Sequence, residues 1–309
     1  DYRKKLFSWI SKAEYRNSLI DRSRNPKFRL DESIVGSARP TQFTLGDQIE
    51  EIHVTNESGV KTVFGLPVYN NLIKEASFNI QSRTTTEQSP RESINGLVNY
   101  ENSDATISNQ KGENNYFNAT TTPTHAYAWL ITEKLSSDYV DVSNDGPTAD
   151  DLGTYTSFQY KKVHHDFKWR TPLDSASFQA QSLHTENDNM ASYVYGSKEI
   201  YYLEKIKSKN FIAIFHTSPR HDGLGVRSER GGVDNQKQLH KLDSIQLFTE
   251  GSYAFGSSEN IPIKTVYFEY DYSLCKNQPN TNALSLDRGK LTLKKLYFRI
   301  LNNFDIIVF

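Results

Sequence analysis

The sequence predicts an all-β protein, a sandwich or a set of open multi-stranded antiparallel sheets, with one peripheral helix at the N-terminus. Three observations favour this class. The chain contains 18 Tyr and 17 Phe, side chains that suit the half-buried surface of a pleated sheet. From about residue 48 the hydrophobic pattern has a period of two, which is typical of strands. Short polar sequences rich in Gly, Asn and Pro separate the alternating segments.

The pattern divides the chain into three regions. Residues 1–47 are expected to form the helix and a linker, residues 48–300 a β-rich domain with room for two subdomains, and residues 301–309 a tail. The 309 residues are enough for a substantial core. Because the chain starts at Asp1 without Met or a signal peptide, we expect a mature or excised segment of a longer protein.

The helix is expected within residues 1–22. Leu6, Trp9, Ile10 and Ala13 follow the i, i+3, i+4, i+7 spacing of one helical face, and the opposite face is basic. A membrane-surface or partner helix is one interpretation. An ordinary helix packed on the domain, or a frayed terminus, is the one we favour.

The first strands are expected at Glu50–Thr55 and Val60–Phe64, joined by the hairpin loop of residues 56–59. Pro67 should end the second strand, because proline cannot donate to a ladder. Another strand is expected around residues 76–80. The polar stretches 81–96 and 101–115 predict surface loops.

The middle of the chain predicts further strands and one long loop. Strands are expected at Ala126–Leu135, Thr154–Val163, Tyr193–Tyr195, Glu199–Ile206, Asn210–Thr217 and Leu242–Thr249. Residues 207–209 should form a hairpin turn. Pro219 and several glycines predict a loop over residues 218–237.

The last two strands have the clearest pattern. Val266–Tyr272 alternates in polarity, and Leu291–Ile300 follows after a loop that contains Pro279. In the final strand the apolar residues change from odd to even positions at Lys294–Lys295. A shift of one residue in phase predicts a β-bulge there.

The composition argues against several classes of protein. The charges balance, 36 Lys+Arg against 37 Asp+Glu, whereas nucleic-acid binders usually carry a basic excess. No apolar run approaches the roughly 18 residues of a transmembrane helix. Cys275 is the single cysteine, so the chain has neither an intramolecular disulfide nor a cysteine zinc cluster. Few cysteines with much Tyr, Asn and Thr suit a bacterial extracellular β protein.

One stretch, Asp138–Tyr160, predicts a particular chemistry, the binding of Ca²⁺. Oxygen side chains at alternate positions followed by Gly146 match the first half of a calcium loop, in which glycine permits the sharp turn. The predicted ligands are Asp141, Ser143, Asp145, Asp150 and Asp151.

The match with a helix–loop–helix calcium site is incomplete. Leu152 stands where that motif has Glu, Pro147 occupies its seventh position, and the flanks predict strands. We therefore expect a calcium-binding β loop. The alternative is an ion-free turn rich in Asp, Asn and Gly.

Other polar groups carry weaker predictions. His164-His165-Asp166 with His184 could supply zinc ligands or a general base, but adjacent strand residues point to opposite faces. Ser218, His221 and Asp222 lie within five residues, whereas catalytic triads are assembled from distant segments. We assign no catalytic residue.

The aromatic side chains suggest a second kind of function. Strand faces that carry Tyr201, Tyr202, Tyr267, Tyr297, Trp129 or Trp169 could stack on sugars, although such residues are more often core or cross-strand pairs. A glycosidase would also need two carboxylates, for which Glu199 and Glu269 are guesses.

Several phrases resemble one family. They are Phe64–Asn70, Asp138–Val142 with Asp150–Gly153, Phe167–Arg170, Tyr195–Ile200, Phe268–Cys275 and Gly289–Tyr297. Together they resemble a region of very large Bacteroidetes proteins that are similar to RHS/YD-repeat proteins and to the B component of insecticidal toxin complexes. The resemblance covers residues 48–298 and implies a β shell or surface structure, in some relatives one that encloses a toxic cargo. No run of YD repeats occurs, so this segment would precede the shell.

We therefore expect a non-enzymatic structural or binding segment of a large secreted or cell-surface bacterial protein, with one Ca²⁺ in the 141–151 loop. Its expected partners are other segments of the same protein, a surface partner or a glycan. The alternative is a carbohydrate-binding module or a glycoside-active domain. Neither a nucleic-acid partner nor a membrane span is expected.

Overall fold

The structure is a computed structural model that describes residues 7–11, 28–30, 48–80, 96–112, 114–179, 189–254, 261–282, 288–300 and 303–305. These residues form a 17-stranded sheet and the short helix α3 (Glu250–Ala254). The strands are β1 (Phe7–Ser11), β2 (Phe28–Leu30), β3 (Ile49–Thr55), β4 (Lys61–Phe64), β5 (Leu66–Asn79), β6 (Leu97–Val98), β7 (Phe117–Thr122), β8 (His125–Leu130), β9 (Glu133–Leu135), β10 (Tyr155–Thr171), β11 (Ala176–Gln179), β12 (Met190–Ser208), β13 (Phe211–Ser228), β14 (Gly231–Thr249), β15 (Lys264–Leu274), β16 (Lys290–Ile300) and β17 (Asn303–Asp305). The predicted all-β class is confirmed.

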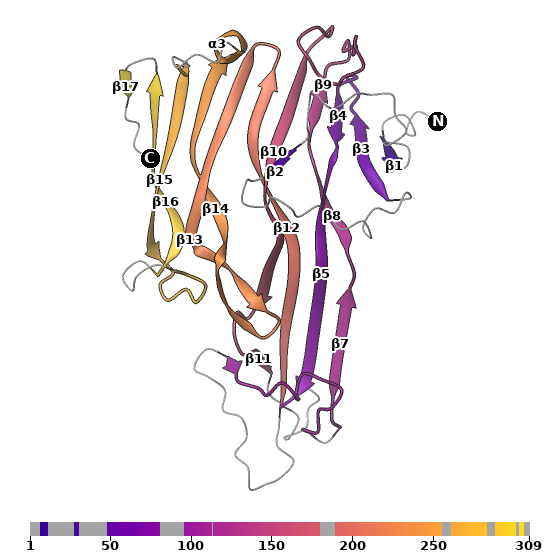
Figure 1. The fold of residues 1–309 in the computed structure, drawn as a ribbon, viewed down its shortest axis with the longest axis vertical. Coiled ribbons are helices and arrows are strands. Elements are labelled where there is room, and N and C mark those ends of the chain that lie inside the picture. Colours follow the sequence, from indigo (N-terminus) through magenta and orange to yellow (C-terminus); the bar gives the residue numbers. More distant parts are fainter. Residues whose placement is uncertain are drawn as a thin grey trace.

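The strands form one open sheet that branches at β12 (Figure 1). On one side β12 pairs with β10, from which the order continues through β9, β4 and β3 to β1. On its other side β12 pairs first with β5 and then, near its C-terminal end, with β13. Strands β7 and β8 line the outer edge of β5, and β14 to β17 follow β13 in sequence order. All these pairs are antiparallel, whereas β2 pairs with β10 in parallel.

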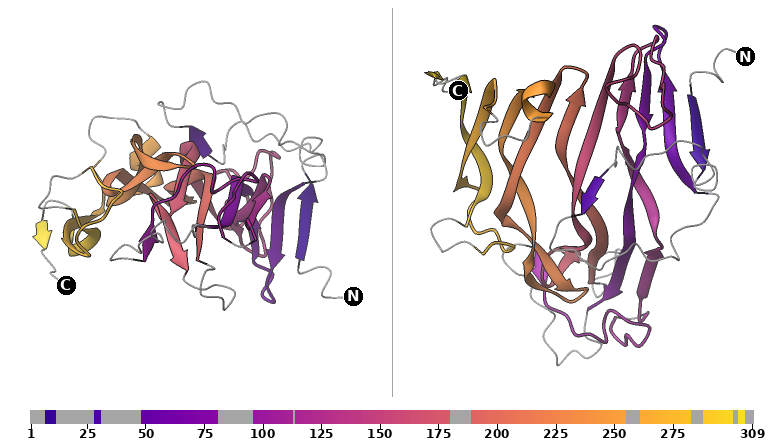
Figure 2. Two further views of the ribbon diagram at one scale, coloured as in Figure 1. Left: turned by 90° about the horizontal axis from the view of Figure 1, so that it is seen from below. Right: turned by 45° about the horizontal axis from the view of Figure 1, so that its top comes forward.

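The main hydrophobic core lies at the lower end of Figure 1, where strands from both sides of β12 meet the far end of the β13–β14 hairpin. Phe78 of β5 is fully buried there and contacts the rings of Tyr100 and Tyr193 at centroid distances of 4.9 and 6.1 Å. Val226 of β13 belongs to the same cluster. The tip of the hairpin thus packs as a second layer over the β5–β12 part of the sheet, as the two views of Figure 2 show.

The N-terminal helix prediction is wrong over Phe7–Ser11, which is strand β1. This segment pairs with β3, from Phe7 opposite Val54 to Ser11 opposite Ile49. The remainder of residues 1–22 lies outside the described residues. A short helix gains most of its stability by packing an apolar face against the rest of the protein. Phe7 and Trp9 are 50% and 59% exposed, so this segment has little such packing, and the hydrogen bonds to β3 stabilise it as a strand. The i, i+2 spacing of these two aromatic residues is also that of a strand.

The loop predicted over residues 218–237 is also wrong. Strand β13 continues to Ser228 and β14 begins at Gly231. The register shifts around Pro219 and Leu224 show that the proline and glycines are accommodated by irregularities in the ladder. Gly225 permits close packing, because a Cβ there would lie 2.9 Å from the carbonyl oxygen of Lys168. The glycine thus lets β13 lie close against the backbone of β10.

We expect Gly231→Ala to destabilise the protein more than the matched variant Gly251→Ala. Gly231 has φ +89°, and a Cβ there would lie 2.4 Å from Asp174 Oδ1. An L-residue at such a backbone angle costs about 1–2 kcal/mol. Gly251 in α3 has no atom within 4 Å of its Cβ position, so alanine should raise the free energy of unfolding by up to about 1 kcal/mol. Urea unfolding measures both, and equal midpoints would contradict this account of Gly231.

The predictions from the sequence agree best with the structure at the hairpins. Strands β3 and β4 are joined through Asn56, whose side-chain oxygen accepts a hydrogen bond from Val60 N. The bulge predicted at Lys294–Lys295 is present, because Glu269 pairs with Lys295 while the next residue pairs with Leu293. The polar stretch 101–115, described except for residue 113, contains no strand. Most of the other polar stretch, 81–96, lies outside the described residues.

Two strand boundaries differ from the prediction in an informative way. Strand β4 ends at Phe64 as expected, but β5 begins at Leu66 and carries Pro67 opposite Trp129. The predicted strand Ala126–Leu135 is two strands, since β8 pairs with β5 and β9 with β4. The β4–β9 ladder therefore ends, and the β5–β8 ladder begins, where both strands turn a corner. Gly65 stands at this corner, where a Cβ would lie 2.5 Å from Thr132 Oγ1.

Candidate functional site

The acidic loop, residues 138–153, joins β9 and β10 at the upper end of Figure 1. A single bridge between Val140 and Leu152 closes it, with N–H···O distances of 3.2 and 3.1 Å. Asn144 and Gly146 have positive φ angles of 57° and 83°, which turn the chain at the tip. The predicted turn between two strands is confirmed.

Asp151 organises this loop from its inner side. Its buried carboxylate accepts hydrogen bonds from Tyr139 OH at 2.8 Å, Val142 N at 3.0 Å and Thr148 N at 2.8 Å. Lys209 of the β12–β13 turn donates to the Asp151 carbonyl oxygen at 2.9 Å. Burial, together with the hydrogen bond to Asp151, raises the pKa of Tyr139 well above its ordinary value. Asp151 thus ties the two arms of the loop to each other and to the neighbouring hairpin.

Three of the five predicted calcium ligands come together. Ser143 Oγ lies 3.0 Å from Asp145 Oδ1 and 2.9 Å from Asp150 Oδ2. Asp141 accepts a hydrogen bond from Gly146 N at 3.0 Å through Oδ2, while its Oδ1 is buried without a hydrogen-bond partner. Asp150, rather than Asp151, therefore faces Ser143 and Asp145. Among the described residues, no group of three or more His, Cys, Asp or Glu side chains is arranged to hold a metal ion.

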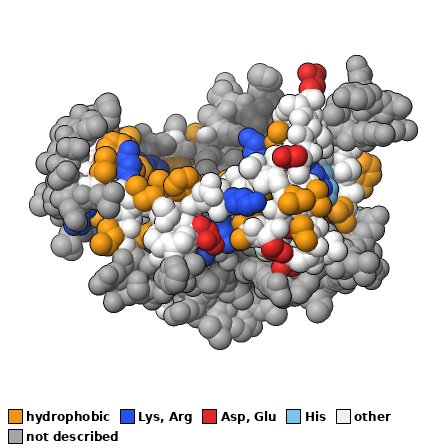
Figure 3. All heavy atoms as spheres, turned by 90° about the horizontal axis from the view of Figure 1, so that it is seen from above, with side chains coloured by type: hydrophobic (Ala, Val, Ile, Leu, Met, Phe, Trp, Pro, Cys, Tyr) orange, Lys and Arg blue, Asp and Glu red, His pale blue; other side chains and the backbone are white. Residues whose placement is uncertain are grey.

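Two grooves flank the acidic loop. The first, of about 440 Å³, lies between the loop and strands β1, β3 and β4. Its lining includes charges of both signs, Lys61 against Glu133 and Asp141, and the imidazole of His53. Figure 3, the same end seen from above, shows Lys and Arg side chains interspersed with Asp, Glu and apolar ones. A mixed surface of this kind favours neither a polyanionic nor a polycationic partner.

The second groove, of about 380 Å³, lies between the β9–β10 ladder and the β12–β13 turn. Its lining includes two lysines, Lys134 and Lys209, and five hydroxyl or amide side chains: Ser136, Thr154, Thr156, Ser208 and Asn210. Phe211, which is 47% exposed, also lines it. Polar hydrogen-bonding groups beside an exposed aromatic ring are the composition of a sugar-binding site.

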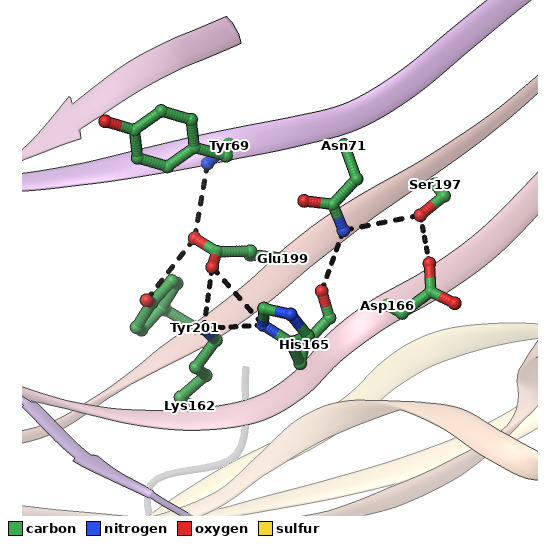
Figure 4. A network of polar contacts seen from close by, with 8 residues as sticks. All are labelled: Tyr69, Asn71, Lys162, His165, Asp166, Ser197, Glu199 and Tyr201. Carbon is green, nitrogen blue, oxygen red and sulfur yellow. Dashed lines mark hydrogen bonds and ion pairs between the residues drawn. The ribbon is translucent and has the colours of Figure 1, made fainter. Parts of the chain in front are cut away.

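A buried polar network occupies the centre of the molecule, where β5, β10 and β12 meet (Figure 4). Lys162 Nζ donates to Glu199 Oε1 at 2.6 Å, and His165 Nδ1 lies 3.0 Å from the same nitrogen. Glu199 Oε2 accepts hydrogen bonds from Tyr69 N and Tyr201 OH, both at 3.4 Å. The side chains of Lys162 and Glu199 are 3% and 1% exposed. This pair is the chain's most completely buried ion pair among the described residues.

A bulge in β10 creates the space for the network. The pairing of β10 with β12 shifts on either side of His164, so residues 165 and 166 have no direct partner across the ladder. The side chain of Asn71 donates to the His165 carbonyl oxygen at 2.9 Å, which compensates for one lost ladder contact. Ser197 hydrogen-bonds to Asp166 beside it.

The two adjacent histidines point apart, as the alternation of a strand predicts. His164 Nε2 lies 2.6 Å from the Gln238 carbonyl oxygen of β14, whereas His165 contacts the buried pair. His184 lies outside the described residues. Ser218, His221 and Asp222 have separate partners, which are Asp243, Asn282 and Arg220 respectively. They do not form a triad.

Most of the aromatic side chains have structural contacts. Tyr267 pairs directly with Tyr297, and their rings stack at 5.0 Å. Tyr202 stacks on His240 at 5.2 Å, and Trp129 Nε1 donates to the Ile49 carbonyl oxygen at 3.4 Å. These are the cross-strand and core contacts that the sequence favours over a sugar-binding platform.

The guessed carboxylate pair is not assembled either. Glu199 lies on β12 and Glu269 on β15, with β13 and β14 between them in the hydrogen-bonded order. Three strand spacings separate them by about 14 Å along the sheet, whereas a glycosidase pair needs about 5–9.5 Å.

No protein-family model matches the chain, and the searches of curated proteins and of solved structures find no significant relative. In the described part of the chain, no helix has the length and apolar character needed to cross a bilayer. The function therefore has to be argued from the geometry given above.

Proposed function

We propose that this chain is a non-enzymatic structural or binding segment of a large, RHS-like, secreted or cell-surface bacterial protein. One observation carries the proposal: the buried charged groups connect strands to one another. Lys162 and Glu199 connect β10 to β12, and Asp222 of β13 accepts from Leu291 N of β16 at 2.9 Å. Groups used in this way stiffen a scaffold.

Two further contacts support the same interpretation. Arg170 of β10 donates to the Glu229 carbonyl oxygen at 2.7 Å and lies 4.4 Å from the centroid of Tyr193. Lys74 of β5 donates to the Glu229 carboxylate at 2.7 Å. The tip of the β13–β14 hairpin is thereby fastened to both sides of β12. Strands β12 and β14 have 19 residues each, which span roughly 60 Å.

An antibody raised against this chain tests where the segment occurs. On immunoblots of the bacterial source, the proposal expects a band far larger than 35.4 kDa, the mass of the chain. Protease added to intact cells or to the culture medium should degrade that band while a cytoplasmic marker survives. A band of the size of this chain that resists the protease until the cells are lysed would refute the proposal.

The proposal includes a Ca²⁺ ion in the acidic loop. The buried Oδ1 of Asp141, which accepts no hydrogen bond, fits a cation, and so do the converging oxygens of Ser143, Asp145 and Asp150. An ion of this kind would stabilise the loop and leave the hydrogen bonds of Asp151 in place.

Thermal melting in EDTA and then in excess Ca²⁺ tests the ion. Ca²⁺ at about 100 times its Kd should raise the free energy of unfolding by about 2.7 kcal/mol, seen as a higher Tm. Asp145→Ala should abolish the shift, whereas Asp243→Ala, which removes a carboxylate of β14 paired with Lys241, should keep it. An unchanged Tm for the native chain means that the loop holds no ion.

A second candidate function, carbohydrate binding, is favoured by the groove beside Phe211. Its volume of about 380 Å³ is that of a small ligand site. A glycan array tests it. If this groove binds sugar, Phe211→Ala should lose the signal by tenfold or more, since the stacking contact is removed. Phe7→Ala removes a similarly exposed ring at the β1 edge and should bind like the native chain.

A further inference from the structure

The buried network in Figure 4 has the composition of a reaction centre as well as of an ion pair. Lys162 Nζ and Glu199 Oε1 are 2.6 Å apart, on neighbouring strands and at the bulge of β10. An amine and a carboxyl group in this position are a nucleophile and an electrophile in contact.

The neighbouring groups fit a condensation between these two. His165 Nδ1 lies 3.0 Å from Lys162 Nζ and 3.6 Å from Glu199 Oε1, so one imidazole lies beside both the amine and the oxygen that would leave. Tyr69 N–H and Tyr201 O–H both donate to Oε2, the oxygen that would carry negative charge in a tetrahedral intermediate.

We propose that Lys162 and Glu199 form an intrachain amide, an isopeptide cross-link between β10 and β12. A proton passes from the Lys162 ammonium through His165 to the Glu199 carboxyl group, which leaves a neutral amine and a neutral acid. The Lys162 nitrogen attacks Glu199 Cδ and forms the C–N bond. The bond from Cδ to Oε1 then breaks. Oε1 leaves as water. It carries the proton that the carboxyl group received first and a second proton that the Lys162 nitrogen loses when the amide forms. No oxidant, reductant or other reactant is needed.

The burial of the pair favours this reaction over simple ion pairing. Two charges in a site closed to water are costly, and the uncharged amine–acid form avoids that cost. Well-oriented groups held together in one molecule reach effective concentrations of about 10⁵–10⁸ M, which exceed the concentration of water that opposes condensation. A chain whose single cysteine excludes an internal disulfide would gain a covalent link between its two central strands.

The chain also contains a matched comparison. Lys74 Nζ and Glu229 Oε1 are 2.7 Å apart, nearly the same distance, but these side chains are 24% and 36% exposed. If the exclusion of water decides the reaction, this pair remains ionic. The inference thus distinguishes two lysine–glutamate pairs of nearly equal separation, one buried with His165 beside it and the other partly exposed, with Tyr193 donating to its carboxylate.

Intact-mass spectrometry of the folded chain, incubated at neutral pH until its mass is constant, tests the proposal. The expected mass is that of the sequence minus one water, and trypsin should no longer cleave after Lys162. Tandem spectra should show a branched peptide that joins Lys162 to Glu199. Lys162→Arg keeps the positive charge but not the acylable amine, so it should have its full sequence mass.

A full sequence mass for the native chain would overturn the proposal, as would a missing water that maps to Lys74 and Glu229 or to any other pair. Circular dichroism of the same sample establishes that it is folded, so a full mass cannot be attributed to an unfolded chain. The branched peptide is sought in the native chain itself and does not depend on whether the variant folds.

Discussion

Phe78→Ala should lower the free energy of unfolding by about 3–5 kcal/mol, the range for a large side chain deleted from a core. Phe78 is fully buried and contacts Tyr100 and Tyr193 through its ring. Its removal leaves a cavity among strands from both sides of β12 and the tip of the β13–β14 hairpin. Denaturant unfolding followed by tyrosine fluorescence measures the change.

Phe211→Ala is the matched control, since it deletes the same side chain where 47% of it is exposed. It should cost about 1–2 kcal/mol, because about half of its surface stays in contact with water after folding. If the two variants unfold at the same denaturant concentration, the core is not centred on Phe78.

Lys162→Met should cost about 3–5 kcal/mol or more, the second large effect. The substitution leaves the Glu199 carboxylate buried without its lysine, and an uncompensated buried charge is strongly destabilising. The expectation holds whether the two groups are an ion pair or an amide. Adding Glu199→Leu removes the orphaned charge and should recover part of the loss.

The control for this variant is Lys295→Met on β16. Lys295 pairs with Glu269 at 3.9 Å, but the glutamate side chain is 51% exposed. Exposed pairs of this kind contribute about 0–1 kcal/mol. Chemical denaturation under one set of conditions compares the two variants. A Lys295→Met effect as large as that of Lys162→Met would contradict the role given to burial.

The fold class, the hairpins and the bulge at Lys294 could be predicted because each depends on local pattern. Alternation of polar and apolar residues predicts which face of a strand is buried. Short loops that contain Asn and Gly predict where the chain turns into the next strand. The same method failed at Phe7–Ser11 and at residues 218–237. At Phe7–Ser11 the outcome depends on a distant partner, β3, which no local pattern contains. Residues 218–237 belong to β13 and β14, which pair with each other; the Pro and Gly that predict a loop are accommodated there by register shifts and by the close packing of Gly225 against β10.

Only one part of the central network could be predicted from the sequence, namely that Lys162 and Glu199 face inwards. Lys162 is in phase with the buried Tyr160, so a charge at that position predicts an inward-facing lysine, and the bulge after Lys162 brings His165 rather than His164 to it. Glu199 is likewise in phase with the buried Tyr193 and Tyr195. Opposite charges on the inward faces of two predicted strands are a signal for a buried pair. Which strands lie side by side could not be read, since Glu199 meets Lys162 across 37 positions.

The acidic loop shows the same division between local and distant information. Its turn, and the convergence of Ser143 with Asp145 and Asp150, follow from residues that are close in sequence. The inward position of Asp151 depends on Tyr139 and on Lys209 of a separate hairpin. Spacing alone therefore could not decide which of the two adjacent aspartates faces Ser143.

The branch at β12 has a consequence for how the chain reaches its native state. Asn79 of β5 pairs with Met190 of β12, and Phe28 of β2 pairs with Tyr160 of β10. Such pairings join segments that are far apart along the chain, and contacts of high sequence separation make folding slow. Because β5, β10 and β13 all add to β12, none of them has its full set of partners until that strand is in place. Assembly on the ribosome should therefore wait until β12 has emerged.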